Sequence, residues 1–104
     1  MGGVQPISST RRNAISRQFG EVLRQCRLAR GWSQSMLSSK SKVDRTYISQ
    51  IECGIHSPTI TVLCRLSRAL QVQPSALVTR LERRLGESRT ARSSRRRDGA
   101  ASQA

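Results

Sequence analysis

The most constraining feature of this sequence is a series of five short segments with helical periodicity, each bounded by residues that begin or end helices. In the first segment, residues 16–30, four apolar residues follow the i, i+3, i+4, i+7 spacing of one buried stripe: Phe19, Val22, Leu23 and Cys26. Gly31 directly follows this segment, at the position where glycine commonly ends a helix. The pattern therefore predicts a helix whose apolar stripe faces a core.

The four later segments carry the same signals. Ser33, Asp44 and Thr59 are favourable N-cap residues for a second, third and fourth helix. Pro74 suits the first turn of a fifth helix over residues 74–85. Alternation of apolar and polar residues never persists over five residues, so no strand pattern competes with these helices. The sequence predicts an all-α fold, a compact five-helix bundle over residues 15–85.

The two ends of the chain differ from this central part. Residues 1–14 lack periodicity and are rich in Gly, Ser and Thr, which favours a flexible N-terminal arm. Residues 86–104 have no apolar face, so burial cannot offset the entropy cost of ordering them. We expect this second segment to be a disordered basic tail.

Charge gives the first indication of function. Nineteen Lys and Arg oppose six Asp and Glu, which gives a net charge of +13 in 104 residues. Residues 15–85, the part expected to fold, contribute +8 of this total. A positive surface of this size attracts polyanions, and nucleic acid is the first candidate.

Other classes of function find little support. The three cysteines have no CxxC spacing and His56 is the single histidine, so we expect neither a metal nor another cofactor. Cys26 and Cys64 are interpreted as small buried residues in a reducing compartment. The sequence offers no nucleophile paired with a base, and we expect no enzyme. It also has no apolar run of the roughly 18 to 20 residues that span a membrane and no signal-peptide pattern, so we expect a cytoplasmic protein.

The second and third segments together fit a more specific plan. Residues 34–40 and 44–52, joined by a turn at 41–43, have the spacing of a helix-turn-helix element. With their neighbours they carry "RGWSQ", "YISQIE", the step from Pro58 to Leu63 and "LSRAL", in order and without a gap. On these motifs, residues 16 to 80 resemble the lambda-repressor-like, or XRE-type, DNA-binding domain.

The resemblance implies a role for each matching position. Arg45, Thr46, Ser49 and Gln50 match the positions of the recognition helix, residues 44–52, that face the major groove. Arg and Gln side chains suit guanine and adenine edges there. For Tyr47, a phosphate contact and partial packing are equally plausible. For His56, a phosphate contact and an exposed position in the loop without a partner are equally plausible. The expected phosphate contacts are Gln34, Lys40, Lys42, Tyr47, His56 and Ser57.

Two further expectations come from the resemblance. It implies an ion pair between Arg27 and Glu52 that joins the first and third helices. Lys42 and Gln71 stand where the family usually has glycine. A side chain in the left-handed backbone region costs on the order of 1 kcal/mol, so either the two turns differ slightly from those of the family or the core tolerates that cost.

The leading hypothesis is a bacterial or phage-type transcription regulator that binds double-stranded DNA as a homodimer on a palindromic operator. Val78, Leu81 and Leu85 are the candidate dimer surface, unless they only close the core. One alternative is the antitoxin of a toxin–antitoxin pair, with the same domain and a toxin as partner. Another is a protein–protein adaptor that kept the fold and lost DNA readout.

Overall fold

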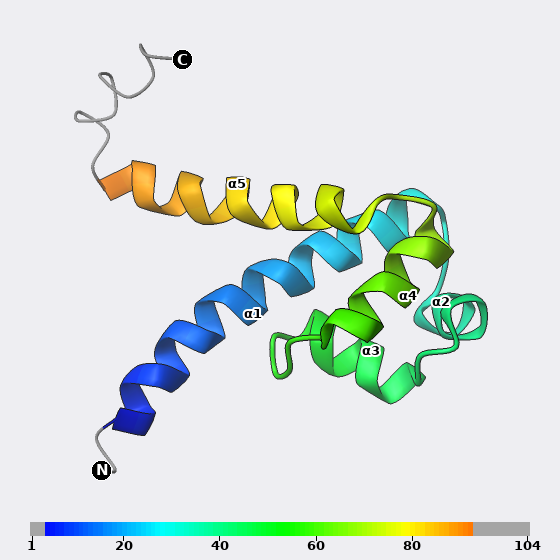
Figure 1. Ribbon diagram of the computed structural model, residues 1–104, viewed down its shortest axis with the longest axis horizontal. Helices are drawn as coiled ribbons and strands as arrows, with labels where there is room; N and C mark the ends of the chain where they lie inside the picture. Colours follow the sequence, from blue (N-terminus) through cyan, green and yellow to red (C-terminus); the bar gives the residue numbers. More distant parts are fainter. Residues whose placement is uncertain (1–3, 93–104) are drawn as a thin grey trace.

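The structure is a computed structural model that describes the backbone of residues 4–92 and the side chains of residues 14–87. Five helices make up this part of the chain, and it contains no strand. Their order is α1 (Val4–Ala29), α2 (Gln34–Ser41), α3 (Arg45–Glu52), α4 (Ile60–Leu70) and α5 (Pro74–Arg92). Figure 1 shows α2, α3 and α4 gathered at one end of the molecule, where α1 and α5 lie close together. The all-α prediction is confirmed.

The predicted caps begin the helices as expected. Ser33 Oγ accepts a hydrogen bond from the Met36 amide at 3.1 Å. Thr59 Oγ1 accepts one from the Val62 amide at the same distance, 3.1 Å. These bonds satisfy amides that have no partner inside the helix. The local sequence thus determines where α2 and α4 start.

All five helices contribute buried residues to one core, in which α1 packs against α3 and α5, and α2 packs against α3 and α4. Helices of eight residues, such as α2 and α3, are not stable alone in water, so packing must hold them. In α2 this packing rests on Leu37, which is fully buried. The buried apolar residues are Phe19, Val22, Leu23, Cys26, Leu37, Val43, Ile48, Ile51, Leu63, Leu66, Leu70 and Leu77.

Two non-glycine residues adopt the left-handed conformation. Lys42 ends α2 at φ 65° and Gln71 ends α4 at φ 60°, the two positions where glycine is usual in the family. The turns therefore keep the family geometry, and each side chain bears its steric cost. Gly31, after α1, and Gly54, after α3, adopt the same left-handed conformation at φ 73° and 80°, and as glycines they do so without that cost.

Both ends of the bundle differ from the sequence-based expectation. Helix α1 begins at Val4, so residues 4–14, expected as a flexible arm, are helical. Pro6 lies in the first turn, where its missing N–H is not needed, and no glycine or proline follows before Gly20. Helix α5 runs to Arg92 through Gly86, which weakens a helix without ending it. The rest of the expected tail, residues 93–104, lies outside the described residues.

The expected burial of Cys64 is wrong. Cys26 is buried, but Cys64 is exposed. The buried side of α4 consists of Leu63, Leu66 and Leu70. Cys64 lies one residue beyond Leu63, and a turn of 100° per residue places it outside this stripe.

Candidate nucleic-acid interface

A tight turn sets α3 against α2. The amide of Lys42 donates to Ser38 O at 2.8 Å, and Ser38 Oγ donates to Val43 O at 2.6 Å. Ser41 Oγ accepts from the Val43 amide at 3.2 Å, while the Val43 side chain is buried. These bonds use the polar groups of the turn and anchor it in the core. The angle between the two helices is therefore well defined.

Helix α3 separates its residues cleanly into two faces. Ile48 and Ile51 are fully buried and attach the helix to the bundle. Asp44 caps the helix, since its Oδ2 accepts from the Thr46 amide at 3.0 Å. The opposite face contains Arg45 and Thr46, which are exposed, and Ser49 and Gln50, which are half-buried. Spacings of one, four and five residues put these four side chains on one side of the helix.

A buried ion pair fixes the carboxyl end of α3. Arg27 Nε donates to Glu52 Oε2 at 2.7 Å, and a second guanidinium nitrogen of Arg27 donates to Glu52 Oε1 at 2.8 Å. The side chains are only 9% and 4% exposed. The hydrogen bond to Glu52 raises the pKa of Arg27 above its ordinary value, although burial acts in the opposite direction. The pair that the resemblance implied is present in the structure.

Gln34 and Trp32 complete this cluster. Gln34 Nε2 donates to Glu52 Oε1 at 3.0 Å, so the first residue of α2 supports the recognition helix directly. Arg27 also donates to the carbonyl of Trp32 at 2.8 Å. Bidentate pairing with additional bonds is the arrangement that compensates buried charges best. The sequence reasoning missed the Trp32 carbonyl, because a backbone acceptor leaves no signal in residue type.

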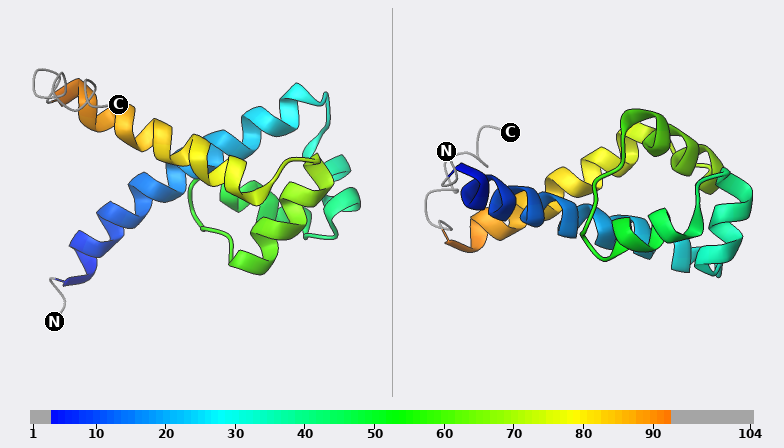
Figure 2. Two further views of the ribbon diagram at one scale, coloured as in Figure 1. Left: turned by 45° about the horizontal axis from the view of Figure 1, so that its top comes forward. Right: turned by 90° about the horizontal axis from the view of Figure 1, so that it is seen from below.

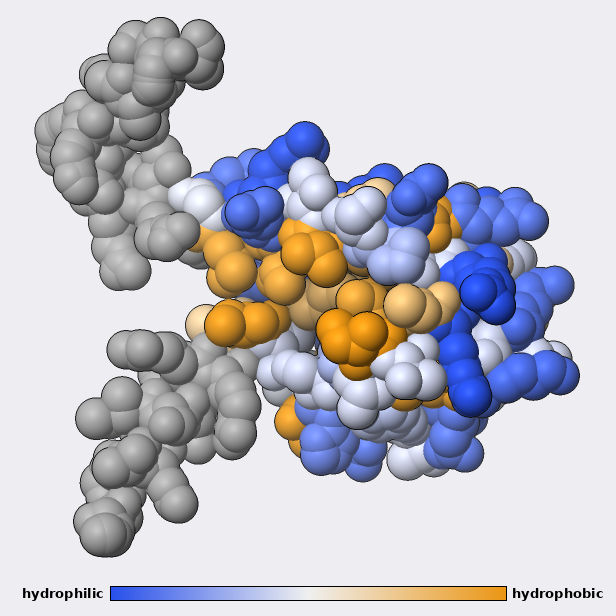
Figure 3. Space-filling view, in the orientation of Figure 1, coloured by the Kyte–Doolittle hydropathy of each residue, from blue (hydrophilic) through white to orange (hydrophobic). Residues whose placement is uncertain are grey.

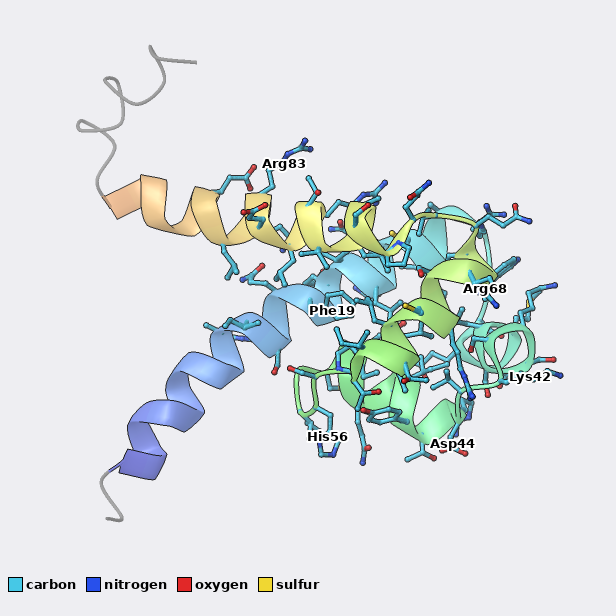
Figure 4. The ribbon with its side chains drawn as sticks, viewed as in Figure 1. Phe19, Lys42, Asp44, His56, Arg68 and Arg83 are labelled. Carbon is cyan, nitrogen blue, oxygen red and sulfur yellow. The ribbon has the colours of Figure 1, made fainter. Side chains whose placement is uncertain are left out.

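The loop from Gly54 to Pro58 lies beside Tyr47 of α3. Tyr47 Oη donates to Ser57 O at 3.3 Å, and the ring centroids of Tyr47 and His56 are 6.0 Å apart. Tyr47 is half-buried, while His56 and Ser57 are exposed. Ser57 Oγ is also 2.6 Å from Ser16 Oγ of α1, a contact that sequence reasoning missed because it joins segments far apart in the chain. Figure 4 shows His56 and Asp44 along the same side of the molecule.

Unpaired positive charge surrounds these elements. Lys40 and Lys42 are exposed at the end of α2, and Lys40 Nζ also lies 5.1 Å from the centroid of the Trp32 ring. Among the side chains described, Arg27 with Glu52 is the one ion pair. The two lysines therefore keep their charge available for an anionic ligand.

The three residues expected on a dimer surface occupy different environments. Val78 is 44% exposed, and Leu81 and Leu85 are half-buried. Leu81 also packs against the core cluster. Figure 3 shows apolar side chains gathered in a patch over α5 and the neighbouring part of α1. On α1, Ile15 is 44% exposed, as much as Val78.

The described residues contain neither a membrane-spanning helix nor a cluster of metal ligands. Within the residues described, no helix has the length and apolar character that crossing a membrane requires. The same residues contain no group of three His, Cys, Asp or Glu side chains arranged to hold a metal ion.

The five-helix fold, with α2 and α3 joined by a tight turn, defines a helix-turn-helix protein. A family model described as helix-turn-helix matches residues 23–77, which is more than half of the chain. The chain belongs to this family, of the XRE or lambda-repressor-like type.

The chain is also similar to relatives with known roles. The chain is 39% identical over 67 residues to the control protein C.BamHI of Bacillus amyloliquefaciens, covering 64% of this chain and 83% of that protein. It is 32% identical over 65 residues to the transcriptional regulator SutR of Escherichia coli, covering 62% of this chain but 36% of that protein.

A solved structure agrees with these relatives. It is the restriction-modification controller protein C.Esp1396I, as a tetramer in complex with its natural 35-base-pair operator. The TM-score is 0.61 at 32% identity, and the match covers 66% of this chain and 91% of that chain.

Proposed function

We propose that this protein is a sequence-specific regulator of transcription that inserts α3 into the major groove of double-stranded DNA. The observation that carries the proposal is the exposed polar face of α3, which consists of Arg45, Thr46, Ser49 and Gln50. The major groove admits an α-helix, and the first residues of a recognition helix reach base edges there. Arg45 suits a guanine and Gln50 an adenine, because each side chain can form two hydrogen bonds with that base.

Phosphate contacts orient the protein on the duplex without reading sequence. We assign them to Gln34, Tyr47 and the loop residues His56 and Ser57, with Lys40 and Lys42 adding charge. Gln34 has a second role, since it also donates a hydrogen bond to Glu52 of α3. It thereby connects the proposed contact with the DNA backbone to the orientation of α3. A regulator of this kind acts in the bacterial cytoplasm at the nucleoid and needs no catalytic activity.

The comparisons support this proposal. C.BamHI is a control protein and SutR a transcriptional regulator. C.Esp1396I binds its operator as a tetramer. The helix-turn-helix family model matches residues 23–77, which include α2 and α3.

A selection of bound duplexes from a random pool, at one stated salt concentration, tests the function directly. We expect a consensus with two related half-sites about one helical turn apart, because a single short helix reads few base pairs. An adaptor without DNA readout predicts a different result, namely binding that has no sequence preference and that disappears at moderate salt. The absence of a consensus would refute the regulator proposal.

We further propose that α5 forms the dimer surface, through Val78, Leu81 and Leu85. Val78 exposes a large apolar side chain on α5. Figure 3 shows an apolar patch over α5 and the neighbouring part of α1, and such patches commonly mark protein interfaces. Leu81 and Leu85 are only partly covered by the chain's own core, so a second copy can bury them further.

Sedimentation of the free protein checks this surface. We expect the wild type to sediment as a dimer at micromolar concentration and Val78→Asp to be monomeric, because an interface buries the introduced charge. The matched control is Met36→Asp on α2, since Met36 is 43% exposed against 44% for Val78 but lies outside α5. A wild type that remains monomeric at high micromolar concentration, with and without DNA, contradicts the proposal.

A further inference from the structure

We propose that the N-terminal part of α1 is a second DNA-binding element, with Arg17 as a contact to the phosphate backbone. This inference rests on the proposed function and extends it to residues that precede the helix-turn-helix match at residue 23. The ligand is the phosphodiester group of the duplex that α3 reads. Three observations support the inference. Helix α1 is packed against α3, Arg17 has no ion-pair partner, and both lie on the side of the molecule that carries α3 and the loop after it.

Helix α1 is held tightly against the end of α3. A Cβ atom on Gly20 would lie 2.7 Å from Glu52 O and closer still to Ile51 O, so only glycine allows this approach. One turn earlier, Ser16 is 4% exposed, and its Oγ is 2.6 Å from Ser57 Oγ in the loop after α3. Residues 16–20 of α1 therefore have a fixed position relative to the recognition helix and the loop.

Arg17 lies against the same loop. A Cβ atom on Gly54 would be 3.0 Å from Arg17 Cα and 3.2 Å from Arg17 Cγ. The stem of the arginine therefore runs beside the loop that carries His56 and Ser57, our proposed phosphate contacts. An arginine attached here adds a cation to a surface that already faces the DNA backbone.

The guanidinium of Arg17 has no carboxylate partner. Its side chain is exposed, and the described side chains contain no ion pair other than Arg27 with Glu52. Glu21, one helical turn further along α1, is half-buried and makes no ion pair with it. Arginine binds phosphate through a planar fork of N–H donors and stays charged at all physiological pH values.

The views of the molecule agree with this placement. Figure 4 shows His56 and Asp44 on one side and Arg83 on the opposite side, beyond α5. In Figure 4 the first half of α1 leaves the bundle toward the side of His56, and Figure 2 shows from two further directions that this half extends away from α2, α3 and α4. DNA that lies along α3 and the loop is therefore approached by α1, whereas Arg83 faces away from it.

The salt dependence of DNA affinity tests the contact, because each phosphate contact releases counterions. The duplex is the consensus from the selection described above, and the proteins are full-length wild type, Arg17→Gln, Arg17→Lys and Arg83→Gln. For Arg17→Gln we expect the slope of log K against log salt to become shallower by about 0.9 for each protomer bound to the duplex. The corresponding loss of affinity is roughly fivefold to tenfold for each bound protomer near 0.1 M salt, with base preference unchanged. Arg17→Lys keeps the wild-type slope because it keeps the charge, and Arg83→Gln keeps it because that residue faces away.

Several results would overturn the inference. One is a wild-type slope for Arg17→Gln, and another is an equal change in slope for Arg83→Gln, which would indicate a general effect of net charge. A loss of affinity in both Arg17 variants at unchanged slope would also overturn it, since the contact would not be ionic. Failure of the proposed function is a separate outcome, in which the selection yields no consensus. The salt slopes of the four proteins are then measured on a random-sequence duplex, and they still show whether Arg17 contacts phosphate.

Discussion

Replacement of Arg27 by alanine is expected to lower the free energy of unfolding by about 3 to 5 kcal/mol. The reason is that Glu52, whose side chain is 4% exposed, would keep its charge in the core with Gln34 as its remaining side-chain donor. The carbonyl of Trp32 would also lose the guanidinium that now donates to it at 2.8 Å. For a domain of this size such a loss approaches the whole of its stability.

Urea denaturation followed by circular dichroism measures this effect. The matched control is the double variant Arg27→Met with Glu52→Leu, which removes both charges and fills similar volume. We expect it to recover most of the lost stability, because replacing a buried pair with apolar residues is commonly neutral. A single variant with wild-type stability and weakened DNA binding would show that Arg27 acts on DNA and not on the fold.

The second large effect concerns the choice of bases. We expect Gln50→Ala to change preference at one base position by about 1 to 3 kcal/mol, because it removes two hydrogen bonds to a base edge. Lys42→Ala should instead weaken binding to all sequences alike and reduce the salt slope by about one for each bound protomer. Competition titrations with single-base variants of the consensus duplex distinguish these two behaviours.

Gln73→Ala is the control for this pair of variants. Gln73 is an exposed glutamine before α5, outside the recognition face, so its replacement should leave both base preference and salt slope unchanged. If Gln50→Ala weakens every sequence by the same factor, Gln50 contacts the backbone and the assignment of this residue to base readout fails.

Most of the fold was predictable because its signals are local. Ser33, Asp44 and Thr59 each accept a hydrogen bond from an amide within the next three residues, so their effect can be read from a few neighbouring positions. At Lys42 and Gln71 the resemblance left two alternatives, a different turn or a tolerated steric cost, and the positive φ values of both residues show the second. In each case the determining contacts lie within one turn of the chain.

The errors arose where the outcome depends on distant parts of the chain. The start of α1 at Val4 was missed because polar composition suggested a flexible arm, although no residue there interrupts a helix. The contact between Ser16 and Ser57 spans 41 positions and involves residues that are common on any surface. The polar face of α3 and the pair of Arg27 with Glu52 were predictable from residue types, whereas the way α1 packs against α3 and the loop after it required the structure.

The carboxylate of Glu52 has a geometric consequence for DNA recognition. It belongs to α3 and is bonded to Arg27 of α1 and Gln34 of α2, so three helices share one fixed point. Arg45 lies at the other end of α3, about 10 Å away at 1.5 Å per residue. Because α3 is held at Glu52, a small rotation of the helix about this end moves Arg45, at the other end, by a larger distance relative to the base edges. Substitutions around Glu52 are therefore able to alter which operator is read without touching a residue that meets DNA.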